Sequence, residues 1–281
     1  MLQNTFCHIP SISSALETKL WEMGIQHWDH LDRLSLDAIG QGKRKTLEDF
    51  VTRSVAELRN DNPNFFADLL PSKEHWRLFR EFRHCVAYLD IETTGLYSGS
   101  DQITTIALYD GKEIKWYVRG DNLEQFKKDI LEYRLLVTYN GKCFDVPFIS
   151  NHFSIDLHMA HIDLRYVLKS LGYSGGLKKC ERRLGIDRGD LEDVDGRVAV
   201  LLWKEYQKHY NQKALDTLLA YNIQDVLSLE LLMVKAYNKK IKLTPFQKQI
   251  VLPTPILPEI PFRAHSRTLD KVMREYERTF W

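Results

Sequence analysis

The sequence of 281 residues lacks a strong excess of either charge and lacks long apolar runs. Its 39 basic and 38 acidic residues give a formal net charge of +1. No overall positive field therefore attracts nucleic acid, and any such contact must come from local patches. No stretch approaches the ~18 consecutive apolar residues of a membrane-spanning helix, and the first residues lack the basic and apolar regions of a signal peptide. We expect no membrane contact.

Cysteine is also scarce, and its positions exclude one class of metal site. The four cysteines are Cys7, Cys85, Cys143 and Cys180, and no two of them have the spacing of a zinc ribbon. With 44% hydrophobic residues, the chain can fold without disulfide bonds. We therefore predict reduced thiols and a cytoplasmic location.

Residues 1–84 carry helical patterns without a strand pattern between them. Apolar residues recur at helical spacing over 14–23, 46–58 and 76–82, and Gly24 ends the first of these segments. We predict a small N-terminal helical region over 1–84.

The pattern changes at Cys85. Residues 86–91 form a short apolar run typical of a buried strand. Asp110-Gly111 predicts a hairpin between strands at 102–109 and 114–118. Further strands are expected at 134–138 and 161–164, with a helix at 123–133 and mostly helix from there to about residue 236. This order predicts a domain over 85–240 of α/β class, a mixed sheet flanked by helices.

The last segment, 241–281, differs from both. Pro253, Pro255, Pro258 and Pro261 lie close together, which excludes a helix over 251–261 and predicts an extended arm. A short terminal helix is expected from 265 to 281.

The first candidate site residues are two acids on the predicted strand 86–91 and just after it. Asp90 and Glu92 are two positions apart, so their side chains project from the same side of the strand. Two adjacent carboxylates repel unless a cation lies between them, and hard divalent ions prefer oxygen ligands. The alternative is a pair of solvated acids at a strand edge.

Two further acids lie in apolar surroundings. Asp145 stands between Phe144 and Val146. Asp225 lies in a helical pattern four positions after Tyr221, so both side chains lie on one helix face. For Asp225 alone the alternative is a solvent-facing helix acid, and for Tyr221 it is a core residue.

Three segments resemble the motifs of DEDD 3′–5′ exonucleases. Residues 89–96 (LDIETTGL) are similar to the first motif, and residues 139–148 (YNGKCFDVPF) to the second. Residues 221–225 (YNIQD) match the tyrosine form of the third, whereas the histidine form would need histidine at Ala220. Residues 84–236 as a whole resemble the YprB-like branch of ribonuclease-H-like domains, and this resemblance implies a five-stranded sheet.

The resemblance also implies a chemistry. Asp90, Glu92, Asp145 and Asp225 would hold two Mg²⁺ or Mn²⁺ ions about 3.5–4 Å apart, one activating the attacking water and the other stabilising the leaving oxygen. Asp90 would bridge both ions, and Asp145 would hold its ion through water. Tyr221 would orient the attacking water through its hydroxyl rather than act as a base.

Substrate contacts are expected from the motifs and from basic residues. The motif positions are Thr93, Thr94, Gly95, Leu96, Asn140 and Phe144. The basic candidates are Lys178 with its neighbours Lys179, Arg182 and Arg183, and the lysines over 235–248. The alternative for such basic runs is a solvated face.

We therefore predict a metal-dependent 3′–5′ exonuclease acting on single-stranded or frayed ends of DNA or RNA. Two alternatives stay open: a nucleic-acid-binding or partner-docking module with the same fold, and a structure-specific endonuclease. The sequence does not distinguish DNA from RNA.

Overall fold

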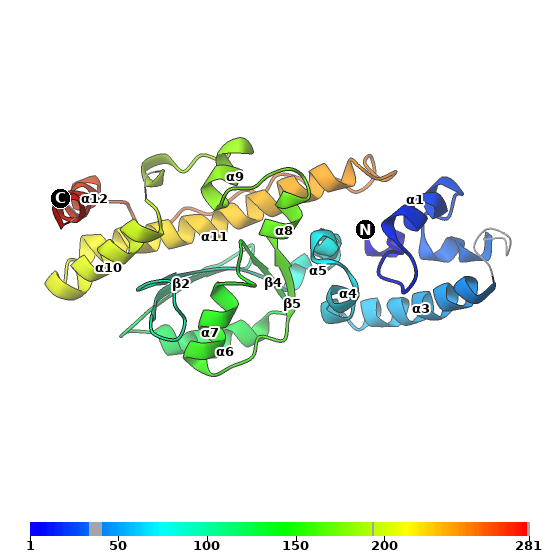
Figure 1. Cartoon of the computed structure of the whole chain (residues 1–281), viewed down its shortest axis with the longest axis horizontal. Coiled ribbons are helices and arrows are strands. Elements are labelled where there is room, and N and C mark those ends of the chain that lie inside the picture. Colours follow the sequence, from blue (N-terminus) through cyan, green and yellow to red (C-terminus); the bar gives the residue numbers. More distant parts are fainter. Residues whose placement is uncertain (34–40, 193, 280–281) are drawn as a thin grey trace.

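A mixed five-stranded sheet forms the centre of the molecule (Figure 1). The computed structural model describes residues 1–33, 41–192 and 194–279. The strands are β1 (Val86–Thr93), β2 (Ile103–Tyr109), β3 (Ile114–Val118), β4 (Leu135–Thr138) and β5 (Ala160–Asp163), in the order β3-β2-β1-β4-β5. β1 pairs antiparallel with β2 and parallel with β4, β3 is antiparallel to β2, and β5 is parallel to β4. The predicted α/β class and mixed sheet are confirmed.

The alternation of side chains along β1 separates two cores. Ala87, Leu89 and Ile91 pack in one apolar cluster with residues of α6 (Phe126–Asp129) and α7 (Asp145–Phe153). Val86 and Tyr88 belong to another cluster, together with residues of the long helix α11 (Gln212–Ile241). Because strand side chains alternate, Asp90 and Glu92 share the face that α11 covers.

Helix α11 crosses the whole of that face (Figure 1). Its 30 residues span about 45 Å at the usual rise per residue. By length and composition alone it is the one helix in the described parts of the chain that could cross a membrane, but its most apolar window is 89% buried inside the protein. A helix that is apolar on all sides is typical of a core, and Val226 and Leu229 are buried as expected.

Helices α8 (Leu164–Lys169), α9 (Leu177–Arg183) and α10 (Gly196–His209) precede α11, and a one-turn 3-10 helix (Gly189–Leu191) lies in the loop before α10. The Asp195 side chain begins α10 by accepting hydrogen bonds from the backbone amides of Arg197 and Val198, at 2.9 and 3.1 Å.

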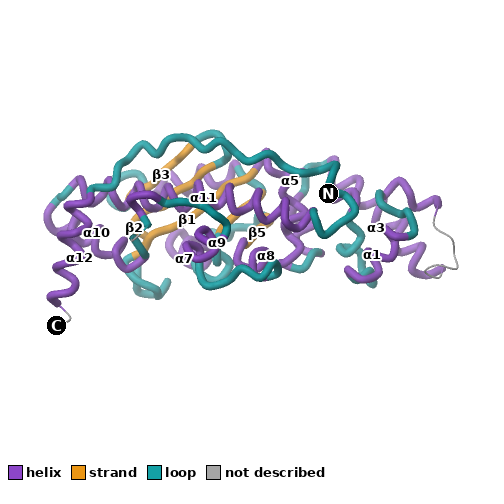
Figure 2. Tube along the Cα trace, turned by 90° about the horizontal axis from the view of Figure 1, so that it is seen from above, coloured by secondary structure: helices purple, strands orange, loops and turns teal. Residues whose placement is uncertain are grey.

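The proline-containing segment is extended, as predicted, and runs along the molecule (Figure 2). Asn238 of α11 holds it by accepting from the Leu252 amide and donating to its carbonyl, at 2.9 and 2.8 Å. Farther along, the His265 amide donates to the Thr217 hydroxyl at 3.0 Å. The terminal helix α12 (Ser266–Thr279) follows; the last two residues of the predicted helix, 280–281, lie outside the described residues.

The N-terminal region is helical, as expected. It contains α1 (Ser14–Glu22), α3 (Gln41–Arg59), α4 (Pro63–Leu69) and α5 (Phe79–Phe82), with 3-10 helices at Leu2–Asn4, Trp28–Arg33, Ser72–Leu78 and Arg83–Cys85. The segment 76–82 differs from the single α-helix expected there. Trp76 and Leu78 belong to the end of the 3-10 helix Ser72–Leu78, whereas Phe79 and Phe82 lie in the four-residue α5, and all four are buried.

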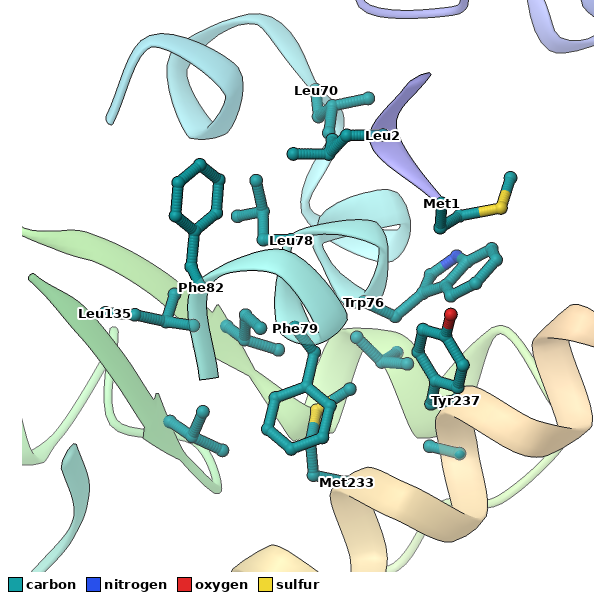
Figure 3. Packing of buried hydrophobic residues seen from close by; sticks show 14 of the residues in the cluster. Met1, Leu2, Leu70, Trp76, Leu78, Phe79, Phe82, Leu135, Met233 and Tyr237 are labelled. Atoms are coloured by element: carbon teal, nitrogen blue, oxygen red, sulfur yellow. The ribbon is translucent and has the colours of Figure 1, made fainter. Parts of the chain in front are cut away.

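This region shares a core with α11. Trp76 packs edge-on against Tyr237, with ring centroids 5.5 Å apart, and Phe79 lies beside Met233 in the same cluster (Figure 3). The apolar cluster is therefore continuous from the N-terminal helices to the sheet. Divisions of the chain after residues 84 and 240 stay predictions.

The predicted helix at 123–133 is a mixed segment. A 3-10 turn (Leu123–Gln125), the four-residue α6 and another 3-10 turn (Ile130–Glu132) follow one another. Leu123, Phe126 and Ile130 are the buried residues, at spacings of three and then four. A change between 3-10 and α geometry keeps all three on the sheet side.

Candidate metal and nucleic-acid site

Two of the predicted site acids lie near the end of β1. Glu92 is buried and Asp90 is half-buried, and both face α11. The pairing of β1 with β2 becomes irregular between Glu92 and Thr93, directly after the second acid. Such bulges redirect side chains at functional edges of a sheet.

Helix α11 brings a third acid to this pair. One carboxylate oxygen from each of Asp90, Glu92 and Asp225 lies within 4.8 Å of the others. Two of these residues are separated from the third by more than 130 positions of the chain, so the fold and not local sequence brings them together. Three convergent carboxylates form a candidate site for a divalent cation.

Asp145 lies beside this group without joining it. It is the first residue of α7 and is buried, and its Oδ1 accepts a hydrogen bond from the backbone amide of Ile91 at 3.3 Å. Its carboxylate is close enough to raise the pKa of both Asp90 and Glu92. The expectation that Asp145 holds its ion through water stays a prediction.

The four acids oppose one another's ionisation. Burial raises the pKa of Asp90 and of Glu92 well above the usual range, and the neighbouring carboxylates of Asp225 and Asp145 raise them further. Burial also raises the pKa of Asp145 to about 7 and that of Asp225 to about 6. A cation at this point would relieve the repulsion that shifts these values.

Two groups that support the acids were missed by sequence reasoning. The Asn222 side-chain amide donates to Asp90 at 2.7 Å, and its oxygen accepts from the Thr105 hydroxyl at 3.0 Å. Asn222 lies within the third motif, directly after Tyr221, and this position could have indicated that it belongs to the site. The second group is the buried pair of Arg188 with Glu181, and Arg188 also donates to Asp225. Arg188 follows Glu181 by seven positions but lies 37 positions before Asp225, and no motif connects the three residues.

Tyr221 faces the same acids from α11, one turn before Asp225. Its side chain is 6% exposed, with the Arg188 guanidinium 5.3 Å and the Lys178 ammonium 5.6 Å from the ring centroid. Burial and the carboxylates of Asp225 and Glu92 raise the pKa of Tyr221. The phenol is therefore neutral at physiological pH and can donate a hydrogen bond.

A cavity of about 630 Å³ opens over this group. Asp90, Glu92, Asp225 and Tyr221 line one part of it. The other part has apolar walls, to which the residues Leu96, Phe144, Leu177, Val200 and Leu201 contribute. A few convergent carboxylates thus adjoin an apolar space, the combination that is usual in ligand sites.

Four of the predicted substrate-binding residues line the cavity, namely Thr93, Gly95, Leu96 and Phe144. Gly95 is required by close packing, because a Cβ there would lie 2.5 Å from the Asp101 carboxylate. Thr94 donates to that same carboxylate at 3.1 Å and so stabilises the loop that carries Leu96.

The other two predicted contacts are engaged within the protein. Asn140 accepts a hydrogen bond from Arg165. The Lys178 ammonium donates to the backbone carbonyls of Glu192, at 2.9 Å, and Val194, and so holds the loop before α10. Contacts of Asn140 and Lys178 with a substrate stay predictions.

The comparison with protein families decides the assignment of the chain. Residues 87–237 match the family described as RNase_H superfamily, and this match covers more than half of the sequence. The chain belongs to the RNase H superfamily. No curated protein matches the sequence. Among solved structures, one described as "apo form of the nuclease" is similar, with 18% identity and a TM-score of 0.31, over 60% of this chain and 89% of that chain.

The residues of this RNase H superfamily chain fit a hard divalent cation. All the converging ligand atoms are carboxylate oxygens, the donors that Mg²⁺ and Mn²⁺ prefer. The raised pKa values of Asp90 and Glu92 express a need for positive charge. Asn222 donates a hydrogen bond to Asp90, and Arg188 donates one to Asp225. Hydrogen-bond partners of this kind orient the ligands of metal ions.

Proposed function

We propose that this protein is a metal-dependent 3′–5′ exonuclease that hydrolyses phosphodiester bonds of DNA or RNA. The observation that carries the proposal is the convergence of Asp90, Glu92 and Asp225 within 4.8 Å on one wall of a cavity that Tyr221 also lines. The match to the RNase H superfamily and the resemblance of the three motifs to the tyrosine-type DEDD enzymes support it.

Each residue then has a role in the proposed reaction. Asp90, Glu92 and Asp225, with Asp145 beside them, would hold two Mg²⁺ or Mn²⁺ ions. When bound, such ions supply positive charge against the charge that develops on the phosphate, and they lower the pKa of water. The neutral Tyr221 hydroxyl would hold the attacking water in line by a hydrogen bond. Asn222 would keep the Asp90 carboxylate in one orientation.

The apolar wall of the cavity favours an unpaired end as the substrate. Leu96 is 78% exposed at the edge of the cavity and Phe144 lies within its lining. Aromatic and apolar side chains bind the faces of unstacked bases, by about 1–3 kcal/mol for each base stacked on a ring. In a duplex, stacking on the neighbouring base pairs would keep these faces covered. We therefore propose a single-stranded or frayed 3′ end as the part of the substrate that enters.

The test is a digest of end-labelled oligonucleotides, single- and double-stranded, of DNA and of RNA. With Mn²⁺ present, a 5′-labelled single strand should shorten in a ladder one nucleotide at a time, and EDTA should stop the reaction. A circular single strand of the same sequence should stay intact. Cleavage of the circle would contradict the exonuclease proposal and favour an endonuclease.

A further inference from the structure

Arg188 is a buried cation directly behind the acidic site. It lies in the loop between α9 and α10, and its side chain is 1% exposed. Its Nη1 donates to both oxygens of Glu181, at 2.9 and 2.8 Å, and its Nη2 donates to Oδ1 of Asp225. One guanidinium therefore connects a residue of α9 with the acid of α11.

Glu181 holds the Arg188 guanidinium in place by a buried ion pair. The Glu181 side chain is fully buried, and both of its oxygens accept from the same guanidinium nitrogen. A buried pair of this kind is costly to separate, because each charge would remain without a partner. The two charges also cancel, so the pair adds no net charge to the four acids. Arg188 is thus a fixed partner of Asp225 and not a substitute for a metal ion.

Arg188 also contacts the second functional residue of α11. Its guanidinium carbon lies 5.3 Å from the centroid of the Tyr221 ring. Tyr221 lies on α11 one helical turn before Asp225. A planar, forked guanidinium can lie near the ring as a cation and donate to the carboxylate at the same time. Lysine would keep the charge but lose this double contact.

Resting on the proposed function, we propose that Arg188, held by Glu181, is a positioning residue for both Asp225 and Tyr221. It fixes one oxygen of Asp225, so the other is presented to a divalent cation in a single orientation. It also fixes the plane of the Tyr221 ring relative to that carboxylate. Loss of such an outer partner typically lowers metal affinity about 10–100-fold.

The experiment is a calorimetric titration of the whole metal-free chain with Mn²⁺. Arg188→Met should bind Mn²⁺ about 10–100-fold more weakly than the unmodified protein, and Arg188→Lys should recover part of the loss. Arg53→Met, at an exposed arginine of α3, is the matched control and should bind as the unmodified protein does. Arg188→Met binding with unchanged or greater affinity would overturn the proposal.

A second variant separates positioning from folding. Arg188→Met leaves Glu181 buried without a partner, whereas Glu181→Leu/Arg188→Met removes both charges and can keep the fold. If this double variant melts as the unmodified protein does in EDTA but binds Mn²⁺ weakly, Arg188 positions the site. Normal Mn²⁺ affinity in the double variant would overturn the proposal.

An unmodified protein that binds no Mn²⁺ would overturn this inference and the proposed function together. If the variants bind Mn²⁺ as expected but the unmodified protein does not cleave the oligonucleotides, only the exonuclease proposal is overturned.

Discussion

The side chain of Asn222 connects α11 to both central strands through Asp90 and Thr105. Its amide donates to the Asp90 carboxylate at 2.7 Å, and its oxygen accepts from the Thr105 hydroxyl of β2 at 3.0 Å. Asn222 and Thr105 are both fully buried. The long helix is thereby oriented by polar contacts at the point where Asp225 must meet Asp90 and Glu92.

Replacement of Asn222 by leucine should destabilise the protein by about 1–3 kcal/mol, because it leaves the buried Thr105 hydroxyl and the half-buried Asp90 carboxylate without their partner. The measurement is urea denaturation in EDTA, so that no metal compensates. Gln224→Ala, on the same helix, is the control; it removes only a contact with Ser228 at 3.3 Å and should change stability by less than about 0.5 kcal/mol. Equal stabilities for the two variants would contradict the role given to Asn222.

Mn²⁺ or Mg²⁺ should raise the melting temperature of the unmodified protein, because the ions bind the folded site and not the unfolded chain. Asp90→Asn should lose most of this shift, since Asp90 is one of the three carboxylates that converge within 4.8 Å. Differential scanning fluorimetry with millimolar Mn²⁺ measures both. If Mn²⁺ does not change the melting temperature of the unmodified protein, the proposed metal site is contradicted.

The pH dependence of stability should show the burial of two acids of the site. The pKa of Asp145 is about 7 and that of Asp225 about 6 in the folded protein, because both are buried. An unfolded aspartate has a pKa of about 3.9. Between these values the folded state holds protons that the unfolded chain has released. The resulting stability is fully present below about pH 4 and is lost as pH rises through about 6 to 7.

Asp145→Asn removes one of these titrating groups and can keep the hydrogen bond from Ile91. In EDTA, its free energy of unfolding should fall less between pH 5 and pH 8 than that of the unmodified protein. Asp156→Asn, at an exposed position, is the control and should follow the unmodified protein. The Mn²⁺ affinity of the unmodified protein should rise over the same pH range, as protons leave its ligands. An identical pH dependence in Asp145→Asn would show that Asp145 does not titrate there.

Local patterns predicted most of the sheet. The apolar run at 86–91 and the Asp110-Gly111 turn each involve a few neighbouring residues, and β1, β2 and β3 lie within a few positions of the predicted strands. The same two-residue alternation placed Asp90 and Glu92 on one side of β1. Geometry of that kind is set within the strand itself, so no knowledge of distant contacts was needed.

Long-range partners could not be predicted in this way. Arg188 and Glu181 are ordinary charged residues in sequence, and their burial against Asp225 depends on how α9, the following loop and α11 pack. The same holds for the two backbone carbonyls that accept from Lys178, which no sequence pattern indicates. The motif resemblance named the acids, but the residues that support them belong to the tertiary structure.

Tyr221 should be separable from the metal ligands by its hydroxyl. Tyr221→Phe keeps the ring near Arg188 and Lys178, which lie 5.3 and 5.6 Å from its centroid, and removes only one hydrogen-bond donor. The phenol is not among the three converging ligands, so Mn²⁺ affinity should stay unchanged. Loss of one water-orienting hydrogen bond should lower the cleavage rate by roughly 10–10³-fold.

Asp90→Asn, in contrast, should be inactive and bind Mn²⁺ weakly. Single-turnover cleavage and Mn²⁺ titration of both variants measure the difference. Cleavage by Tyr221→Phe at the unmodified rate would mean that Tyr221 is a core residue, and the tyrosine-type assignment would fail even if the four acids remain the metal site.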